Sequence, residues 1–336
     1  MTVFAQIAPI EPGVSHDLAI WRAARYSDIR YKLNLTLEKM SPVLKGTLEI
    51  RVDIGARTLM SASPQGGEIA PIILDWRKIK GSESLSTIST VSINGVSVLP
   101  EEPAMRTGVS ALHFEESNEH LIFRDGVKAG ENVIKLDFTS PILTSGAAVT
   151  RYVDKEDGGE YIYSLFVPSD ASTAFPVFDQ PDLKARFKLT VGVPVRDDGL
   201  NWHVISNTPG ERSREGGLYD LHDSRHMDDK AYIFTAFAET KPISTYVFAF
   251  AAGDFAEFSD DKSVPPAVAG GLTREPKKVS GNPSLSNADR QPPATAGGTD
   301  KKALSDKTSE PLTRVYVRRS QAKKFEKEAP EVFRLT

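Results

Sequence analysis

Hydrophobic and polar residues alternate along much of the chain. Residues 28–37 place Ile29, Tyr31 and Leu33 on one face and polar side chains on the other, which is the period of two expected for a half-buried strand. The pattern returns in residues 44–54 after a Ser-Pro turn. We therefore predict that these two segments form a β-hairpin.

Further short segments of the same kind follow at close intervals, and no long helical pattern competes with them. One of them is closed by Asn-Gly, the strongest short hairpin signal. The fold class is therefore predicted as mainly β, with mostly antiparallel sheets. The segments are 72–76, 89–93, 111–114, 120–123, 132–138, 161–167, 185–191, 203–206, 217–221, 231–237, 245–251 and 312–318.

Two helices are predicted beside the strands. Ser15 can cap a short N-terminal helix whose apolar side includes Leu18 and Trp21 and which ends near Tyr26. Residues 321–333 are predicted to form a C-terminal linker helix.

The stretch 161–191 contains two apolar runs, 161–167 and 185–191, joined by a connector, residues 168–184, that is rich in turn-forming residues. Pro176 and Pro181 fix φ, and Asp170 and Ser172 can accept hydrogen bonds from nearby backbone N–H groups. The sequence predicts that one strand ends here, the chain folds back, and another strand begins.

Residues 169–171 and 175–187 resemble the signature of the N-terminal β-domain of aminopeptidase N-like zinc metallopeptidases, the gluzincin aminopeptidases. The resemblance extends from Gly13 to about Phe258. It implies a large saddle-like, multi-sheet β-domain from a family that removes N-terminal residues of peptides with metal-activated water. The signature residues, expected to be structural, are Phe175, Pro176, Phe178, Asp179, Pro181, Asp182, Lys184 and Arg186.

The resemblance also implies a role for the residues just before the connector. In the family a Gln-x-Glu element helps to hold the free α-ammonium of the peptide, but the matching positions here are Leu165 and Val167. Two arginines that commonly precede Phe-Pro are replaced by Ser172 and Thr173. Asp170 is a candidate substitute for the missing carboxylate, and its alternative role is that of a helix cap or turn acceptor.

Composition narrows the possible functions. The net charge of −4 gives no basic surface for nucleic acid, and no apolar run reaches the roughly 20 residues of a membrane helix. The absence of cysteine excludes disulfides and thiolate metal sites. Localisation stays open between cytoplasmic and, if a signal peptide has been lost, periplasmic or extracellular.

One pair of histidines has the spacing of a zinc motif. His222 and His226 imitate HExxH, but Asp223 stands where the motif needs a glutamate, and predicted strands flank the pair where a helix is required. We interpret this segment as a polar hairpin tip. No residue is therefore assigned to catalysis or metal binding, and zinc is expected in the catalytic domain of the family.

The chain changes character from residue 259. Residues 259–311 contain no aromatic side chain and carry a near-repeat, Pro-Pro-Ala-x-Ala-Gly-Gly, which predicts a disordered insertion. The predicted organisation is a flexible N-terminus or signal-peptide remnant, the β-domain, the insertion, a final strand of the β-domain, and a helix toward an absent catalytic domain. The boundaries are 1–12, 13–258, 259–311, 312–320 and 321–336.

The predicted function follows the resemblance. The chain is expected to be the substrate-wall domain of a zinc aminopeptidase, truncated before the catalytic domain and inactive by itself, with that domain and a peptide as its partners. Two alternatives remain open: a non-catalytic β-module that binds a protein or peptide, and a non-functional truncated remnant. We also expect an exposed apolar patch where a catalytic domain would cover the sheet.

Overall fold

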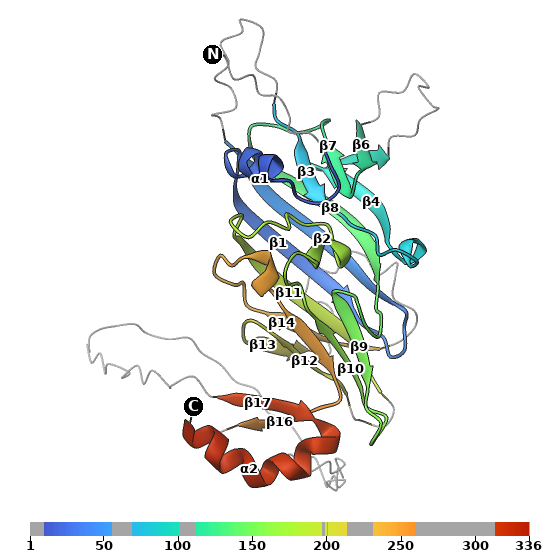
Figure 1. Ribbon diagram of the computed structural model, residues 1–336, viewed down its shortest axis with the longest axis vertical. Coiled ribbons are helices and arrows are strands. Elements are labelled where there is room, and N and C mark those ends of the chain that lie inside the picture. The colour runs from blue at the N-terminus through green and yellow to red at the C-terminus, as the bar shows by residue number, and fades with distance from the viewer. Residues whose placement is uncertain are drawn as a thin grey trace, which may run out of the picture. The chain divides into compact units, whose positions relative to one another are not determined.

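The computed structural model describes residues 10–55, 69–100, 112–196, 199, 201–213, 231–259 and 313–335 (Figure 1). Contacts divide the chain into two compact units. The first comprises Met1–Phe255 with Arg318–Ser320, and the second comprises Ala256–Val317 with Gln321–Thr336. The predicted domain boundaries given above remain a prediction.

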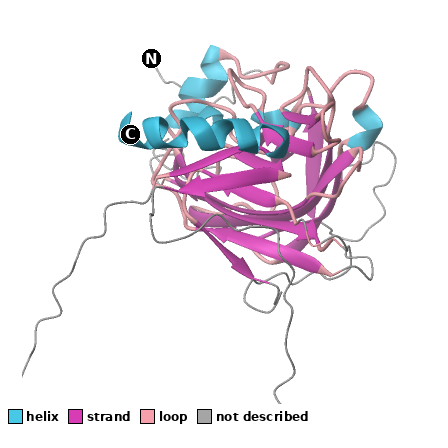
Figure 2. Cartoon of the chain, turned by 90° about the horizontal axis from the view of Figure 1, so that it is seen from below, coloured by secondary structure: helices cyan, strands magenta, loops and turns pink. Residues whose placement is uncertain are grey.

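Strands dominate the described chain, as Figure 2 shows in magenta. The larger sheet has the strand order β13-β14-β11-β1-β2-β8-β4-β5-β6-β7-β3, and a smaller sheet has the order β12-β15-β10-β9. The larger sheet contains β1 (Tyr26–Thr36), β2 (Val43–Ile54), β3 (Ile72–Asp75), β4 (Thr87–Ile93), β5 (Val96–Pro100), β6 (Leu112–Ser117), β7 (His120–Phe123), β8 (Gly130–Pro141), β11 (Ala185–Pro194), β13 (Gly210–Ser213) and β14 (Tyr232–Phe237). The smaller sheet contains β9 (Val149–Val153), β10 (Glu160–Ser164), β12 (His203–Ser206) and β15 (Phe250–Gly253).

The mainly β, mostly antiparallel fold class is thus confirmed. β1 and β2 form the predicted antiparallel pair, with Leu33 opposite Leu48. Two described strand pairs are parallel: β5 with β6, and β1 with β11, where Ile29 lies opposite Ala185. The parallel pairing joins the first strand of the sheet to one far along the sequence.

The N-terminal helix is α1 (His16–Ala23). It begins where the sequence predicts, because the Ser15 hydroxyl accepts a hydrogen bond from the Leu18 N–H at 3.2 Å. Leu18 and Trp21 are buried, whereas Ile20 is exposed. The helix therefore packs one side on the sheet.

The observed elements differ from the predicted ones in a few places. Residues 245–251 begin with a 3-10 helix, η6 (Thr245–Val247), before β15, and β10 ends at Ser164 instead of 167. The strands β5, β9, β13 and β16 (Phe255–Ser259) were not predicted, since they are short and weakly alternating. The predicted strand 217–221 and the insertion 259–311 lie outside the described residues, apart from Ser259.

Aromatic side chains fill the space between the two sheets of the first unit. Phe187 of β11 stacks on Tyr31 of β1 at 4.8 Å between ring centroids and on Phe248 at 4.4 Å. Phe248 in turn lies 6.1 Å from Phe166, which follows β10, and Phe175 of the connector lies 5.7 Å from Phe166. The connector is thereby held between the sheets, and its position is fixed from both sides.

The second unit contains α2 (Ala322–Leu335) and all but one residue each of β16 (Phe255–Ser259) and β17 (Arg314–Arg318). β16 and β17 form a two-stranded sheet. The rings of Phe258 and Phe325 lie 4.9 Å apart, so α2 contacts this sheet. The helix predicted for 321–333 is present with similar bounds.

Candidate functional site

The residues between β10 and the connector alternate between exposed and buried. Leu165 and Val167 are 58% and 53% exposed, while Phe166 between them is 1% exposed. The alternation continues that of β10, where Ile162 is buried and Tyr163 is 42% exposed. Both predicted substrate-wall positions therefore point to solvent in this chain.

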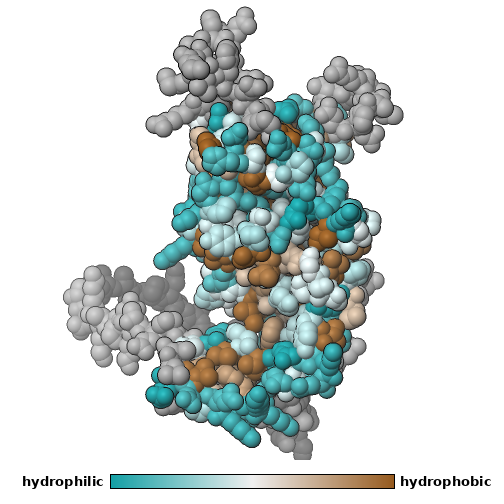
Figure 3. All heavy atoms as spheres, in the orientation of Figure 1, coloured by the Kyte–Doolittle hydropathy of each residue, from teal (hydrophilic) through white to brown (hydrophobic). Residues whose placement is uncertain are grey.

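These side chains belong to a wider apolar surface, which we call the apolar face: Tyr163, Leu165, Val167, Val247, Ala249 and Ala251. Tyr163 lies opposite Ala251 in the β10–β15 register, and the backbone of Phe250 exchanges two hydrogen bonds with the Ser164 hydroxyl. Leu165 and Val167, which follow β10, and Val247 and Ala249, which precede β15, are all exposed. Figure 3 shows apolar surface among hydrophilic side chains on the side where β9 and β10 lie. The face offers apolar contact and no charge.

Asp170 has an intramolecular cation partner. Its carboxylate accepts a hydrogen bond from Arg77 at 2.5 Å, and Arg77 also donates to the Ser169 carbonyl at 3.4 Å. The Asp170 side chain does not cap the 3-10 helix η3 (Ala171–Thr173) that follows it. The Asp170 carboxylate is thus paired on the protein, and its proposed part in ammonium binding remains a prediction.

The two residues that stand in place of the family arginines are buried. Ser172 and Thr173 are 5% and 4% exposed, and the Thr173 hydroxyl donates to the Asp170 carbonyl at 2.8 Å. Both short side chains are therefore buried within the turn that follows Asp170.

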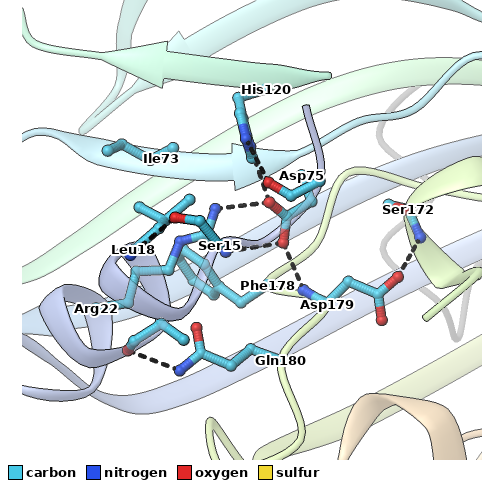
Figure 4. Close-up of polar contacts among 12 residues, drawn as sticks. Ser15, Leu18, Arg22, Ile73, Asp75, His120, Ser172, Phe178, Asp179 and Gln180 are labelled. Atoms are coloured by element: carbon cyan, nitrogen blue, oxygen red, sulfur yellow. Dashed lines mark hydrogen bonds and ion pairs between the residues drawn. The ribbon is translucent and has the colours of Figure 1, made fainter. Parts of the chain in front are cut away.

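Behind the connector lies a buried charged cluster centred on Asp75 at the end of β3 (Figure 4). Arg22 of α1 donates to both carboxylate oxygens at 2.9 and 2.7 Å. His120 Nδ1 lies 2.9 Å from Oδ1, and the Asp179 N–H donates to Oδ2 at 2.8 Å. Burial works to raise the pKa of Asp75, but Arg22 and His120 outweigh it and hold this pKa below its ordinary value. The cluster ties helix, sheet and connector together.

Asp179 is the second carboxyl group of this region. Its carboxylate accepts a hydrogen bond from the Ser172 N–H at 3.0 Å. Burial is the main cause that raises the pKa of Asp179 to about 6, and the nearby negative charge of Asp75 adds to it. The side chain therefore titrates close to the physiological range.

The remaining signature residues, which are expected to be structural, differ in burial and in their contacts. Phe175 and Phe178 are fully buried, and the Phe178 N–H donates to the Tyr31 hydroxyl at 3.0 Å. Asp182 accepts from Gln180 at 2.9 Å, and Arg186 donates to Asp28 at 2.8 Å. Among the other signature positions, Pro176 is buried, whereas Pro181 and Lys184 are exposed.

The charged cluster was missed in the sequence. Its members come from α1, β3, β7 and the connector, which are far apart in the sequence. The one available signal was Asp75 at the end of the fully apolar run 72–74.

No group of three or more histidine, cysteine or acidic side chains suited to a metal occurs in the part of the chain that the structure describes. The pair His222 and His226 lies outside that part. The described residues therefore provide no zinc site. Likewise, none of the described helices is long and apolar enough to cross a membrane.

Comparison with known proteins places this site in a family. The chain is 32% identical over 208 residues to probable M1 family aminopeptidase 1 of Encephalitozoon cuniculi, which is 62% of this chain and 20% of that protein. It is 30% identical over 196 residues to leucyl aminopeptidase of Saccharolobus solfataricus, 58% of this chain and 22% of that protein. It is also 37% identical over 84 residues to aminopeptidase N of Streptomyces lividans, 25% of this chain and 9% of that protein.

The matched region spans only about a fifth of the length of the first two relatives. The family model of the Peptidase M1 N-terminal domain matches residues 27–247, which contain the larger sheet apart from Tyr26, the connector, and strands β9, β10 and β12 of the smaller sheet. The chain therefore belongs to the Peptidase M1 N-terminal domain family.

Proposed function

We propose that this chain is the substrate-wall domain of a zinc aminopeptidase that cleaves N-terminal residues from peptides. The observation that carries the proposal is the family match across residues 27–247, together with relatives whose names describe aminopeptidases. The zinc ion and the catalytic groups would come from a separate catalytic domain. By itself, the chain is expected to be inactive.

The apolar face supports a specific form of this role. Leu165 and Val167 are exposed at the end of β10, where a wall residue must be to touch a peptide. Neither can pair with an α-ammonium group, because a cation leaving water needs a charged or hydrogen-bonding partner. In this proposal the face contacts the apolar part of the peptide, and another domain pairs with its ammonium group.

A second candidate is a non-catalytic module that binds a protein or peptide. The same apolar face favours it, because such a surface is typical of interaction sites on β-domains. Activity after fusion to a catalytic domain distinguishes the two candidates.

The test compares the purified chain with a longer polypeptide in which an M1 catalytic domain follows it. Zinc content and hydrolysis of amino-acid anilides are measured on both. We expect the chain to be inert and free of stoichiometric zinc, and the longer polypeptide to bind zinc and cleave. If the chain alone binds stoichiometric zinc and cleaves, the proposal is wrong and His222 and His226 become the first residues to examine.

Substitutions in the longer polypeptide test the wall itself. Leu165→Gln with Val167→Glu introduces the side chains of the family element and is expected to lower KM several-fold, since a carboxylate then pairs with the substrate ammonium. The matched control is Leu99→Gln with Val96→Glu on β5, because both control side chains are 52% exposed. Equal KM values for both double variants would argue against a wall at residues 165–167.

A further inference from the structure

His120 is enclosed by oxygen atoms on both sides of its ring. It begins β7, lies opposite Asp75 in the β3–β7 register, and its side chain is fully buried. Nδ1 lies 2.9 Å from the Asp75 carboxylate. Nε2 lies 3.0 Å from the Glu11 carbonyl oxygen and 3.1 Å from that of Gly13.

The hydrogen-bonding capacity of these partners decides the protonation state of the His120 ring. A backbone carbonyl and an ionised carboxylate can only accept, while a neutral imidazole carries one N–H and one bare nitrogen. Asp75 stays ionised, because Arg22 donates to both of its oxygens. A neutral His120 protonated on Nδ1 would turn the lone pair of Nε2 toward two carbonyl oxygens, and one protonated on Nε2 would leave Nδ1 without a proton 2.9 Å from the Asp75 carboxylate. Only the doubly protonated ring supplies a donor on each side.

We propose that His120 is an imidazolium in the folded chain at neutral pH, and that its charged ring holds residues 10–13 against the β-domain, so that this segment detaches when the proton is lost. The attachment is made through backbone carbonyls. Besides the two on His120, the Ile10 carbonyl accepts from the Asn118 amide at 2.7 Å. Ile10 packs in part against the core, and Glu11 and Pro12 are exposed.

The groups around the ring shift the pKa of His120 in opposite directions. Burial and Arg22 of α1 lower the pKa of His120, while Asp75 of β3 and the Glu11 carbonyl raise it, and the net shift is upward. Asp179 of the connector reaches the cluster through its N–H on Asp75. On β6, the uncharged Ser117 lies opposite His120, and the neighbouring Glu116 pairs with Lys78.

The sign of the pH effect follows from the direction of this shift. The Glu11 carbonyl contributes to raising the pKa of His120, so this pKa is higher with residues 10–13 attached than with them detached, and attachment is favoured below the pKa of the detached state. Attachment is then lost as pH rises through the raised value. Between these two values the equilibrium constant for attachment falls about tenfold per pH unit.

Nuclear magnetic resonance of the ¹⁵N-labelled full chain tests the proposal directly. Long-range correlations from the ring carbons to the ring nitrogens are expected to show two protonated nitrogens for His120 at pH 7. Heteronuclear relaxation of the Glu11, Gly13 and Val14 amides is then followed from pH 6 to pH 9.5. These amides are expected to become mobile at the pH at which the ring titrates.

Two outcomes would overturn the proposal. A single bare nitrogen on His120 at pH 7 contradicts the imidazolium, and amides that stay rigid after the ring has titrated contradict its role in attachment. His120→Gln keeps a donor without the charge, and is expected to leave residues 11–14 mobile at every pH. His16→Gln, at an exposed site on α1, is the matched control and is expected to behave like the wild-type chain. If His120→Gln does not fold, the wild-type titration still decides.

Discussion

The charged cluster and the apolar face reverse the usual distribution of side chains in adjoining parts of one domain. Arg22, Asp75 and His120 are charged or titratable and fully or nearly fully buried, whereas Leu165 and Val167 are apolar and more than half exposed. The polar contacts described above provide the buried groups with charge-assisted partners. The exposed groups have no comparable partner among the described residues. The charged cluster therefore stabilises the fold, whereas the apolar face is a surface suited to binding another molecule.

The largest expected effect comes from removing the charge at the centre of the cluster. Asp75→Asn leaves Arg22 and His120 buried without their counter-charge, and is expected to lower the free energy of unfolding by about 3–5 kcal/mol. Urea denaturation measures this loss. Asp28→Asn is the control, because its partners Arg30 and Arg186 are 44% and 35% exposed, and each such surface pair contributes about 0–1 kcal/mol. If both variants lose a similar amount of unfolding free energy, the buried charge is no more important for stability than the exposed one.

Asp179 gives the next effect, and it depends on pH. Its folded pKa of about 6 lies above the ordinary 3.8, so its favourable contribution is present below pH 4 and is lost as pH rises through 6. Asp179→Asn lacks this titration, and the stability of the wild-type chain relative to the variant is expected to fall by about 1–3 kcal/mol between pH 4 and 7. Urea unfolding at several pH values measures the difference. Parallel stability profiles for the two chains would contradict the expectation.

A smaller effect is expected at the start of α1. Ser15→Ala removes the acceptor for the Leu18 N–H and should cost about 1 kcal/mol. Thermal unfolding measures it, and Ser15→Asp, which restores an acceptor, should recover most of the loss. A Ser15→Ala chain as stable as the wild type would show that the cap adds nothing to the packing of Leu18 and Trp21.

The apolar face is expected to give the smallest change in stability and a clear change in association. Leu165→Ser with Val167→Ser alters stability by less than about 0.5 kcal/mol, because these side chains are already exposed. Binding of a hydrophobic dye and self-association in sedimentation experiments should both decrease. Leu99→Ser on β5 controls for exposure alone. A wild-type chain that is monomeric at high concentration and binds no dye would contradict an associating face.

The sequence predicts the sheets better than it predicts the charged cluster. Alternation is local, so residues 28–37 and 44–54 identify β1 and β2 within a few positions. The charged cluster depends on contacts between residues as distant as Arg22 and Asp179, and nothing near either residue specifies its partner. The exposure of Leu165 and Val167 also required the structure, because their alternation with Phe166 does not say which side faces the core.

The parallel pairing of β1 with β11 constrains how the domain can be made. As the polypeptide leaves the ribosome, the hairpin of β1 and β2 emerges long before Ala185, the partner of Ile29, has been synthesised. Until then one edge of β1 has its backbone hydrogen-bonding groups unpaired and open to other chains. Arg30 and Lys32 of β1 carry positive charges along this unpaired edge. Newly made chains are therefore most vulnerable to aggregation during the interval between these two strands, and chaperones would be needed most at that stage.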